Sequence, residues 1–539
     1  MTKTPNTSTI GQALVAGLKA RGVETVFGIP GVHTIELYRG LAGSGIRHIT
    51  PRHEAGAAFM ADGYARVSGK PGVAFVITGP GVANTLTPMG QARADSVPIL
   101  VVSGVNAQPT LGLGMGHLHE LPDQRAMVAS VALSATRIEA ASDLSPTLDQ
   151  AFDLLEHGRG GPVHIEVPTD VMPAPCPGDL VTAVTAAPAR PGPNRAPNTA
   201  QLEQAAQMLC QARAPIILVG GGARYCGDLI AQLANHLSAP VMQTANARGM
   251  MHGHPLALPA SPCLDAVRAL IHSSDAVLAI GTEFGPTEYD MYAKGDLPAP
   301  PGMIRIDIDA DQLARHPAAL KICADARAAL SLLVPQVCMG SAHGQDGAAR
   351  VAKALADGWA ELTPVMQDQV RMLEAMRDAA PNSLIVGDST QPIYAGNIWY
   401  DHDRPGGWFN AATGFGALGF GVPAAIGAAI AAPDAHVYCL TGDGGLQFSL
   451  AELMTAFDAQ LNITFVVWNN HGFQEIADSM QAAGVPVLGC TPTPPRMAEL
   501  AAACQLPFVS IPCSGAALQT AMDQLRATPG PRMIEIQIG

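Results

Sequence analysis

Two short apolar runs, HVYCLT and ITFVVW, each end at a polar turn and enclose a helix-like segment. The runs are rich in β-branched and aromatic residues, which favours buried parallel strands. Between them, SLAELMTAFDAQ has apolar residues at helical spacing, with Ser449 placed to cap its start. Residues 436–470 are therefore predicted to form a strand–helix–strand unit. Its polar ends, GDG at 442–444 and NN at 469–470, would emerge at one carboxyl edge of a parallel sheet.

Strand-like and helix-like segments alternate along the whole chain of 539 residues. The strand-like runs are TVFGIP, RHITP, GVAFVITG and PILVVSG, then APIILVGGG, DAVLAIG and MIRIDID, then SLIVGD, HVYCLTGD and ITFVVWNN. This alternation predicts an α/β protein with three doubly wound parallel sheets. A stretch rich in Pro and Ala at 171–200 and a weaker break at 336–350 separate them. We expect domains at 1–172, 199–335 and 356–539, joined by linkers at 173–198 and 336–355.

Composition argues against several classes of partner. The formal net charge of −14 and the lack of any basic run argue against nucleic acid and anionic membranes. Ten cysteines without a C-x-x-C pair indicate reduced thiols, and the N-terminal residues lack the apolar core of a signal peptide. We therefore expect a cytoplasmic protein. The run GFGALGFGVPAAIGAAIAA at 414–432 could imitate a membrane span, but its glycines and proline favour a buried helix.

The two polar strand ends could serve one bound group. Asp443 and Asn470 supply oxygen ligands of the kind that Mg²⁺ prefers, and Mg²⁺ often holds phosphate oxygens as well. Gly442, Gly444 and Gly445 would let the backbone approach those phosphates closely. A lone GDG would favour an ordinary tight turn, but GDG and NN at matched strand ends favour a metal–phosphate site.

These motifs resemble a known family. GDG followed by NN is similar to the thiamine diphosphate signature. The segment RHEAGAAFMADGYARVSGKPGVAFVITGPGVANTLTPMGQARADSVPILVVSG and the segment GFGALGFGVPAAIGA resemble acetohydroxyacid synthases, pyruvate oxidases and related 2-oxo acid decarboxylases. The resemblance covers essentially the whole chain. It implies a pyrimidine-binding, a central and a diphosphate-binding domain, in that order.

The resemblance also implies roles for individual residues. Glu54, from the R-H-E motif, would bond the pyrimidine nitrogen N1′ and so help the cofactor's aminopyrimidine to remove the C2 proton. Its small apolar neighbours suit a dry site for tuning a carboxyl pKa, whereas the alternative is a glutamate favoured by the helix macrodipole. Leu418 would prop the cofactor in its V shape, and the carbonyls of Gly416 and Gly472 would contact its 4′-amino group and Mg²⁺. The remaining implied cofactor contacts are Ser389, Thr390, Gln391, Gly442, Asp443, Gly444, Gly445, Asn470 and Phe473.

Two further segments carry weaker expectations. GGGARYCG at 220–227 lacks the third glycine of a dinucleotide loop, at Tyr225, and GTEFGPTEYDMY at 281–292 replaces the arginine-bearing FAD segment of the synthases. We expect no FAD, although some relatives bind it in the central domain. GHLHE at 116–120 occupies the position of a cavity-lining segment in relatives, which makes His117 and His119 candidate catalytic residues. A loop with incidental histidines is the alternative.

Three functional classes fit these motifs: a non-oxidative decarboxylase, an acetolactate synthase-type carboligase, and a non-catalytic scaffold. A scaffold has no need of Glu54, Asp443 and Asn470 together. After NN the synthases carry a methionine and, four residues later, a tryptophan that selects the second 2-oxo acid. Glu475 and Ser479 stand there in this chain. NNHGFQE is closer to pyruvate decarboxylases, which have an active-site glutamate one residue further on.

Four segments, GVHTIELYRGL, GHLHELPDQRAM, TEFGPTEYDMY and GDSTQPIYAGN, most closely resemble the 5-guanidino-2-oxopentanoate (2-ketoarginine) decarboxylases of arginine catabolism. The resemblance implies conversion of this acid to 4-guanidinobutanal and CO₂, with synthase-type carboligation as the alternative. A guanidinium never loses its charge, so its cavity needs carboxylates. The candidates that follow strands are Glu475, Asp478, Asp388, Glu283, Glu288 and Asp290.

Glu475 has a second expected role beside the thiazolium, where it would assist protonation. The family also implies an assembly, because its pyrimidine-bonding glutamate and its metal site come from different subunits. We therefore expect at least a homodimer, and more specifically a homotetramer.

Overall fold

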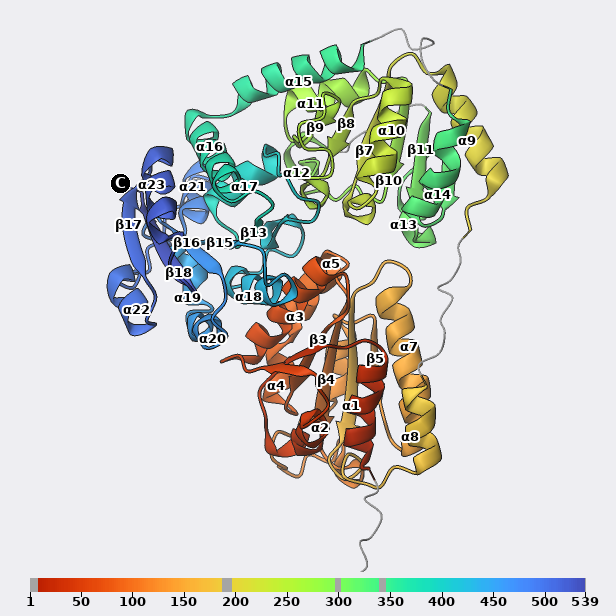
Figure 1. Cartoon of the computed structure of the whole chain (residues 1–539), viewed down its shortest axis with the longest axis vertical. Coiled ribbons are helices and arrows are strands. Elements are labelled where there is room, and N and C mark those ends of the chain that lie inside the picture. The colour runs from red at the N-terminus through yellow and green to blue at the C-terminus, as the bar shows by residue number, and fades with distance from the viewer. Residues whose placement is uncertain (1–7, 187–195, 296–301, 339–345, 539) are drawn as a thin grey trace, which may run out of the picture.

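Three parallel sheets of six strands each form the framework of the protein, and helices cover both faces of each sheet (Figure 1). The computed structural model describes residues 8–186, 196–295, 302–338 and 346–538. All strand pairs in these sheets are parallel, which confirms the predicted fold class.

The first sheet has the order β2-β1-β3-β4-β6-β5. Its strands are β1 (Thr25–Gly28), β2 (Arg47–Ile49), β3 (Gly72–Val76), β4 (Ile99–Val105), β5 (Ser134–Arg137) and β6 (Pro162–Pro168). Its helices are α1 (Ile10–Ala20), α2 (Ile35–Leu41), α3 (Glu54–Ser68), α4 (Pro80–Asn84), α5 (Leu86–Ala94), α6 (Gln124–Ala129), α7 (Leu144–Glu156) and α8 (Gly178–Thr185).

The central sheet has the order β12-β11-β10-β7-β8-β9. Its strands are β7 (Pro215–Val219), β8 (Val241–Gln243), β9 (Ala257–Leu258), β10 (Ala276–Ile280), β11 (Met303–Asp307) and β12 (Leu320–Cys323). Its helices are α9 (Thr199–Gln211), α10 (Gly227–Leu237), α11 (Asp265–His272), α12 (Met291–Lys294), α13 (Ala310–Arg315) and α14 (Ala326–Leu333).

The third sheet has the order β14-β13-β15-β16-β18-β17, so the chain reverses its direction of strand addition between β13 and β15. Its strands are β13 (Leu384–Gly387), β14 (Trp408–Asn410), β15 (Val437–Gly442), β16 (Ile463–Asn469), β17 (Phe508–Pro512) and β18 (Arg532–Gln537). Its helices are α16 (Pro364–Ala379), α17 (Gln391–Ile398), α18 (Gly421–Ala431), α19 (Asp443–Gln447), α20 (Glu452–Asp458), α21 (Gln474–Ala482), α22 (Met497–Ala503) and α23 (Gly515–Leu525). The preceding helix α15 (Gly347–Glu361) packs on α11 and β9 of the central domain. Ligands of open α/β sheets bind at the carboxyl ends of the strands at such a reversal.

Helices α3 and α18 cross at close range and join the first domain to the third (Figure 1). A Cβ atom on Gly63 would overlap the carbonyl oxygen of Ala424, and one on Gly427 would overlap that of Met60. Next to this crossing, the rings of Phe59 and Phe420 pack edge to face with centroids 5.4 Å apart. One hydrophobic core therefore runs through both domains.

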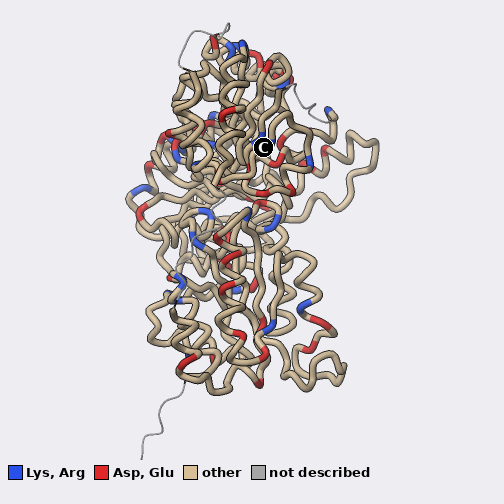
Figure 2. Tube along the Cα trace, turned by 90° about the vertical axis from the view of Figure 1, so that its right-hand side faces the viewer, with Lys and Arg blue, Asp and Glu red and all other residues tan. Residues whose placement is uncertain are grey.

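Helix α18 is buried along its length, which confirms the expectation of a glycine-rich core helix within 414–432. In the described parts of the chain, no helix combines the length and apolar character needed to span a membrane. Figure 2 shows basic residues interspersed with acidic ones along the chain.

Several local predictions were wrong. The linker predicted at 173–198 contains α8, which packs on α1 and α7 and buries Val184, and the linker predicted at 336–355 contains the first half of α15. Within these linkers, residues 187–195 and 339–345 lie outside the described residues. Ser449 caps no helix, because two short helices, α19 and α20, replace the single one expected and Ala451 precedes α20.

Candidate active site

The turns after β15 and β16 meet at one edge of the third sheet. Gly442, the last residue of β15, pairs with Trp468 of β16, so Asp443 and Asn470 follow neighbouring strands. Asp443 is fully buried as the first residue of α19. Burial raises the pKa of its carboxyl group, although backbone N–H groups of Asn470, Asp443 and Gly444 oppose that shift.

The Asn470 amide points at two other oxygen atoms. One of its terminal atoms lies 2.9 Å from the Gly472 carbonyl oxygen and 3.1 Å from Asp443 Oδ1. If that atom is nitrogen, it donates to both oxygens. If it is oxygen, the nitrogen turns to Gln391 Oε1 at 3.4 Å, and three oxygens then face one another. Octahedral Mg²⁺ at its usual bond lengths places adjacent ligand oxygens about 2.9 Å apart, so a cation would favour the second orientation.

A second oxygen atom of Asp443 is also available to a cation at this turn. Asp443 Oδ2 is buried and has no hydrogen-bond partner. The described residues contain no cluster of three His, Cys, Asp or Glu side chains able to hold a metal ion. A hard cation here would therefore be held by one carboxylate, one amide oxygen and one backbone carbonyl, a ligand set that suits Mg²⁺.

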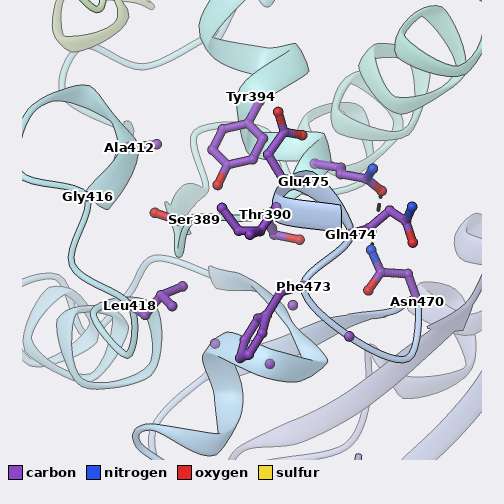
Figure 3. A pocket seen from close by; sticks show the side chains of 16 residues that line it. Ser389, Thr390, Tyr394, Ala412, Gly416, Leu418, Asn470, Phe473, Gln474 and Glu475 are labelled. Atoms are coloured by element: carbon purple, nitrogen blue, oxygen red, sulfur yellow. Dashed lines mark hydrogen bonds between the residues drawn. The ribbon is translucent and has the colours of Figure 1, made fainter. Parts of the chain in front are cut away.

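A cavity of about 330 Å³ opens beside this turn, at the reversal point between β13 and β15 (Figure 3). The structure brings most of the residues predicted for cofactor binding together around it: Ser389, Thr390, Gln391, Gly416, Leu418, Gly442, Gly444, Gly445, Asn470, Gly472 and Phe473. Glu475 also lines it, as do Tyr394, Ala412, Gln474 and Ile476, which the sequence did not single out. Gly444 makes room for the Phe473 ring, and Gly416 has a positive φ of 76°.

Asp388 lies behind this cavity and not within it. Its two carboxylate oxygens accept hydrogen bonds from the backbone N–H groups of Ser389, Gly419 and Gly421, at 2.8, 2.9 and 3.0 Å. Burial raises the pKa of Asp388 to about 6 despite these donors. Oδ1 bonds the Ser389 N–H and Oδ2 bonds the segment that leads into α18, so both oxygens have backbone partners. Contact of Asp388 with a substrate tail stays a prediction that this geometry does not favour.

The acidic residues of the central domain lie elsewhere too. Glu283 forms an ion pair with Arg159, and Asp290 precedes α12. Glu288 is half-buried, its carboxylate accepts a hydrogen bond from the Ala245 N–H at 3.1 Å, and desolvation raises its pKa to about 7. None of the three is among the residues lining the 330 Å³ cavity, and their substrate role stays a prediction.

Glu283 and Glu288 instead line a second cavity, of about 450 Å³, beside the glycine-rich turn after β7. Asp307, at the end of β11, and Arg224 line it as well. This is the region on which the expectation of no FAD rests, and that expectation stays a prediction.

Glu54 begins α3 in the first domain and is half-buried. Asn84 Nδ2 donates to its Oε2 at 2.9 Å. The buried Glu452 carboxylate of the third domain accepts the N–H groups of Arg52 and His53, both at 3.0 Å, and so fixes the start of α3. All residues that line the cavity belong to the third domain, so Glu54 does not reach it within one described chain.

The two histidines of the segment at 116–120 differ in their exposure. His117 is exposed, whereas His119 is half-buried with a positive φ of 62°. The ring of His119 packs edge to face on that of His33, with centroids 5.3 Å apart, and both Nδ1 atoms are buried without a partner. Burial, together with His119, lowers the pKa of His33. His33 was missed because a single histidine in a loop after a strand carries no sequence signal.

Known proteins agree with this architecture. Three family models match the chain in order: the thiamine pyrophosphate enzyme N-terminal TPP binding domain on 8–127, the central domain on 202–333 and the C-terminal TPP binding domain on 388–536. The chain belongs to the thiamine pyrophosphate enzymes.

Two groups of relatives are similar to this thiamine pyrophosphate enzyme. A probable 2-ketoarginine decarboxylase of Pseudomonas aeruginosa is 42% identical over 499 residues, covering 92% of this chain and 88% of the relative. Acetolactate synthase isozyme 1 large subunit of Escherichia coli is 30% identical over 493 residues, covering 87% and 83%. Acetolactate synthase of Mycobacterium bovis is 29% identical over 488 residues, covering 85% and 75%.

Proposed function

We propose that this protein is a thiamine diphosphate- and Mg²⁺-dependent 2-oxo acid decarboxylase that converts 5-guanidino-2-oxopentanoate to 4-guanidinobutanal and CO₂. The main observation that supports this choice of substrate is the charge of the cavity lining. Among the described residues that line it, Glu475 alone is charged, and no Lys, Arg or His lines it. Such a cavity favours a substrate with a cationic tail. The similarity to the probable 2-ketoarginine decarboxylase supports the same acid.

Thiamine diphosphate supplies a carbon nucleophile and accepts the electron pair released when CO₂ leaves. Asp443, Asn470 and the Gly472 carbonyl would hold the Mg²⁺ that binds its diphosphate. Gly442, Gly444 and Gly445 line the cavity beside the same turn, and their backbone would approach the phosphates there. The Leu418 side chain points into the cavity and would support the cofactor from below (Figure 3).

Glu475 is the second residue of α21 and opens onto the cavity. Burial, followed by the charge of Asp478, raises the pKa of its carboxyl group. Within the described residues no hydrogen-bond donor or cation is bonded to this carboxylate. It can therefore pair with a guanidinium, and its raised pKa also suits delivery of a proton after decarboxylation. His119, and His117 with less support from its exposed position, remain proposed catalytic residues of the first domain.

The proposed assembly completes the site. All of the cavity lining comes from the third domain, and we propose that Glu54 from a second subunit reaches the cofactor there. The minimum is then a homodimer, and we propose a homotetramer with closed symmetry. We also propose a cytoplasmic location, with which the lack of any disulfide among the ten cysteines agrees.

A panel of 2-oxo acids tests this function. The loaded enzyme should release CO₂ and 4-guanidinobutanal from the guanidino acid, and Glu475→Gln should lower kcat/KM for that acid by roughly 10²-fold or more. Glu499→Gln is the matched control, because Glu499 is an exposed glutamate of the same domain and lies outside the cavity lining. A wild-type enzyme that prefers pyruvate and forms acetolactate would instead establish the synthase alternative.

A further inference from the structure

Tyr394 faces Glu475 across one side of the cavity. Tyr394 belongs to α17 and Glu475 to α21, and both line the same space. Figure 3 shows the Tyr394 ring beside the Glu475 carboxylate, with Leu418 and Phe473 on the opposite side. The two groups also interact electrostatically, because the Glu475 charge adds to burial in raising the pKa of Tyr394.

The position of the Tyr394 ring is fixed from two directions. Its neighbours Pro392 and Ile393 are buried and anchor α17. Its side chain hydrogen-bonds to that of Ser389. The hydroxyl group is therefore directed toward Ser389, and the half-buried ring remains available to the cavity.

An aromatic ring beside an unpaired carboxylate is a binding site for a flat cation. A guanidinium stacks on aromatic rings through its plane and bonds carboxylates with its N–H groups, so it can use both partners at once. A neutral chain of the same length gains only apolar contact with the ring. This arrangement distinguishes substrates by tail charge.

We propose that Tyr394 and Glu475 together clamp the cationic tail, which makes Tyr394 a specificity-determining residue. The proposal rests on the proposed decarboxylase function and adds the aromatic half of the site. Cation–π attraction predicts that Tyr394→Leu lowers the selectivity for the guanidino acid over 2-oxooctanoate, a neutral acid of the same chain length, by about 2- to 30-fold. Tyr394→Phe keeps the ring and should retain most of that selectivity.

The experiment measures kcat/KM for both acids in the wild type, in Tyr394→Leu and in Tyr394→Phe. Tyr292→Leu serves as the control, because Tyr292 is 80% exposed and does not line the cavity. Binding of 4-guanidinobutanoate and of heptanoate, a neutral acid of the same chain length, measured by calorimetry, gives a second readout that needs no turnover. The double variant with Glu475→Gln should lose less selectivity than the product of the two single losses, because both residues act on one cation.

The outcomes separate the two proposals. If the wild type shows no preference for the guanidino acid, the proposed substrate is wrong, and the clamp with it. If the wild type prefers that acid but Tyr394→Leu lowers kcat/KM equally for both acids, the clamp is wrong and the substrate stands. A Tyr394→Phe variant as unselective as Tyr394→Leu would also overturn the clamp, because the ring would then contribute nothing.

Discussion

Replacement of Asp443 by asparagine should affect the free and the loaded protein in opposite directions. Without a cation, Asp443 Oδ2 is a buried carboxylate oxygen with no partner. Leaving such an atom unsatisfied costs about 1–3 kcal/mol. Asparagine removes the charge and keeps one oxygen for the backbone N–H groups. For a domain of this size the change corresponds to a Tm increase of about 2–12 °C in the free protein.

The loaded protein should show the reverse. Mg²⁺ and thiamine diphosphate at a hundred times their Kd stabilise a folded protein by about 2.7 kcal/mol, which Asp443→Asn should abolish. Thermal unfolding of wild type and variant, with and without both ligands, measures the two effects. The exposed Asp478→Asn variant should behave as wild type. A ligand-induced Tm increase of wild-type size in Asp443→Asn would refute the assignment of this turn as the metal site.

Three further predictions concern other parts of the molecule. Glu54→Gln should lower kcat by at least ~10²-fold while calorimetry shows that thiamine diphosphate still binds, because glutamine can bond N1′ but cannot exchange a proton with it; near-normal turnover would contradict this role. Asp388 has a pKa of about 6 against an ordinary 3.8, so the folded state holds its proton more tightly. It therefore contributes about 3 kcal/mol of stability that is fully present below pH ~4 and lost as pH rises through about 6. Denaturant unfolding across this range should be less pH-dependent in Asp388→Asn, and an unchanged slope would show that Asp388 is not the group responsible. Light scattering should find a dimer or tetramer, and an active monomer would disprove the shared site.

The closeness of Asp443 and Asn470 was predictable because it follows from the sheet topology. Two buried strands joined by a helix place their carboxyl ends side by side, so Asp443 and Asn470 had to lie close together. The α/β class followed in the same way from the alternation of patterns. The alternative orientations of the Asn470 amide, however, depend on the bound ion, which no sequence pattern reports.

Side-chain direction was the part that sequence could not supply. Asp388 follows a strand at the correct edge, but its carboxylate turns back to bond the start of α18. Glu288 also follows a strand, yet it lines another cavity. Tyr394 was missed because an aromatic residue between Ile393 and Ala395 is typical of a buried core position. Its exposure to the cavity depends on where α17 sits against α21.

The crossing of α3 and α18 has a consequence for engineering. Gly63 and Gly427 each abut the backbone of the other helix, so neither helix can accept a side chain at its contact point. The first and third domains are therefore matched to each other at this contact. A chimera that takes one of these domains from an acetolactate synthase should assemble only if the donor also has glycine at the corresponding contact. The central domain, which contributes no residue to this crossing, is the natural module to exchange.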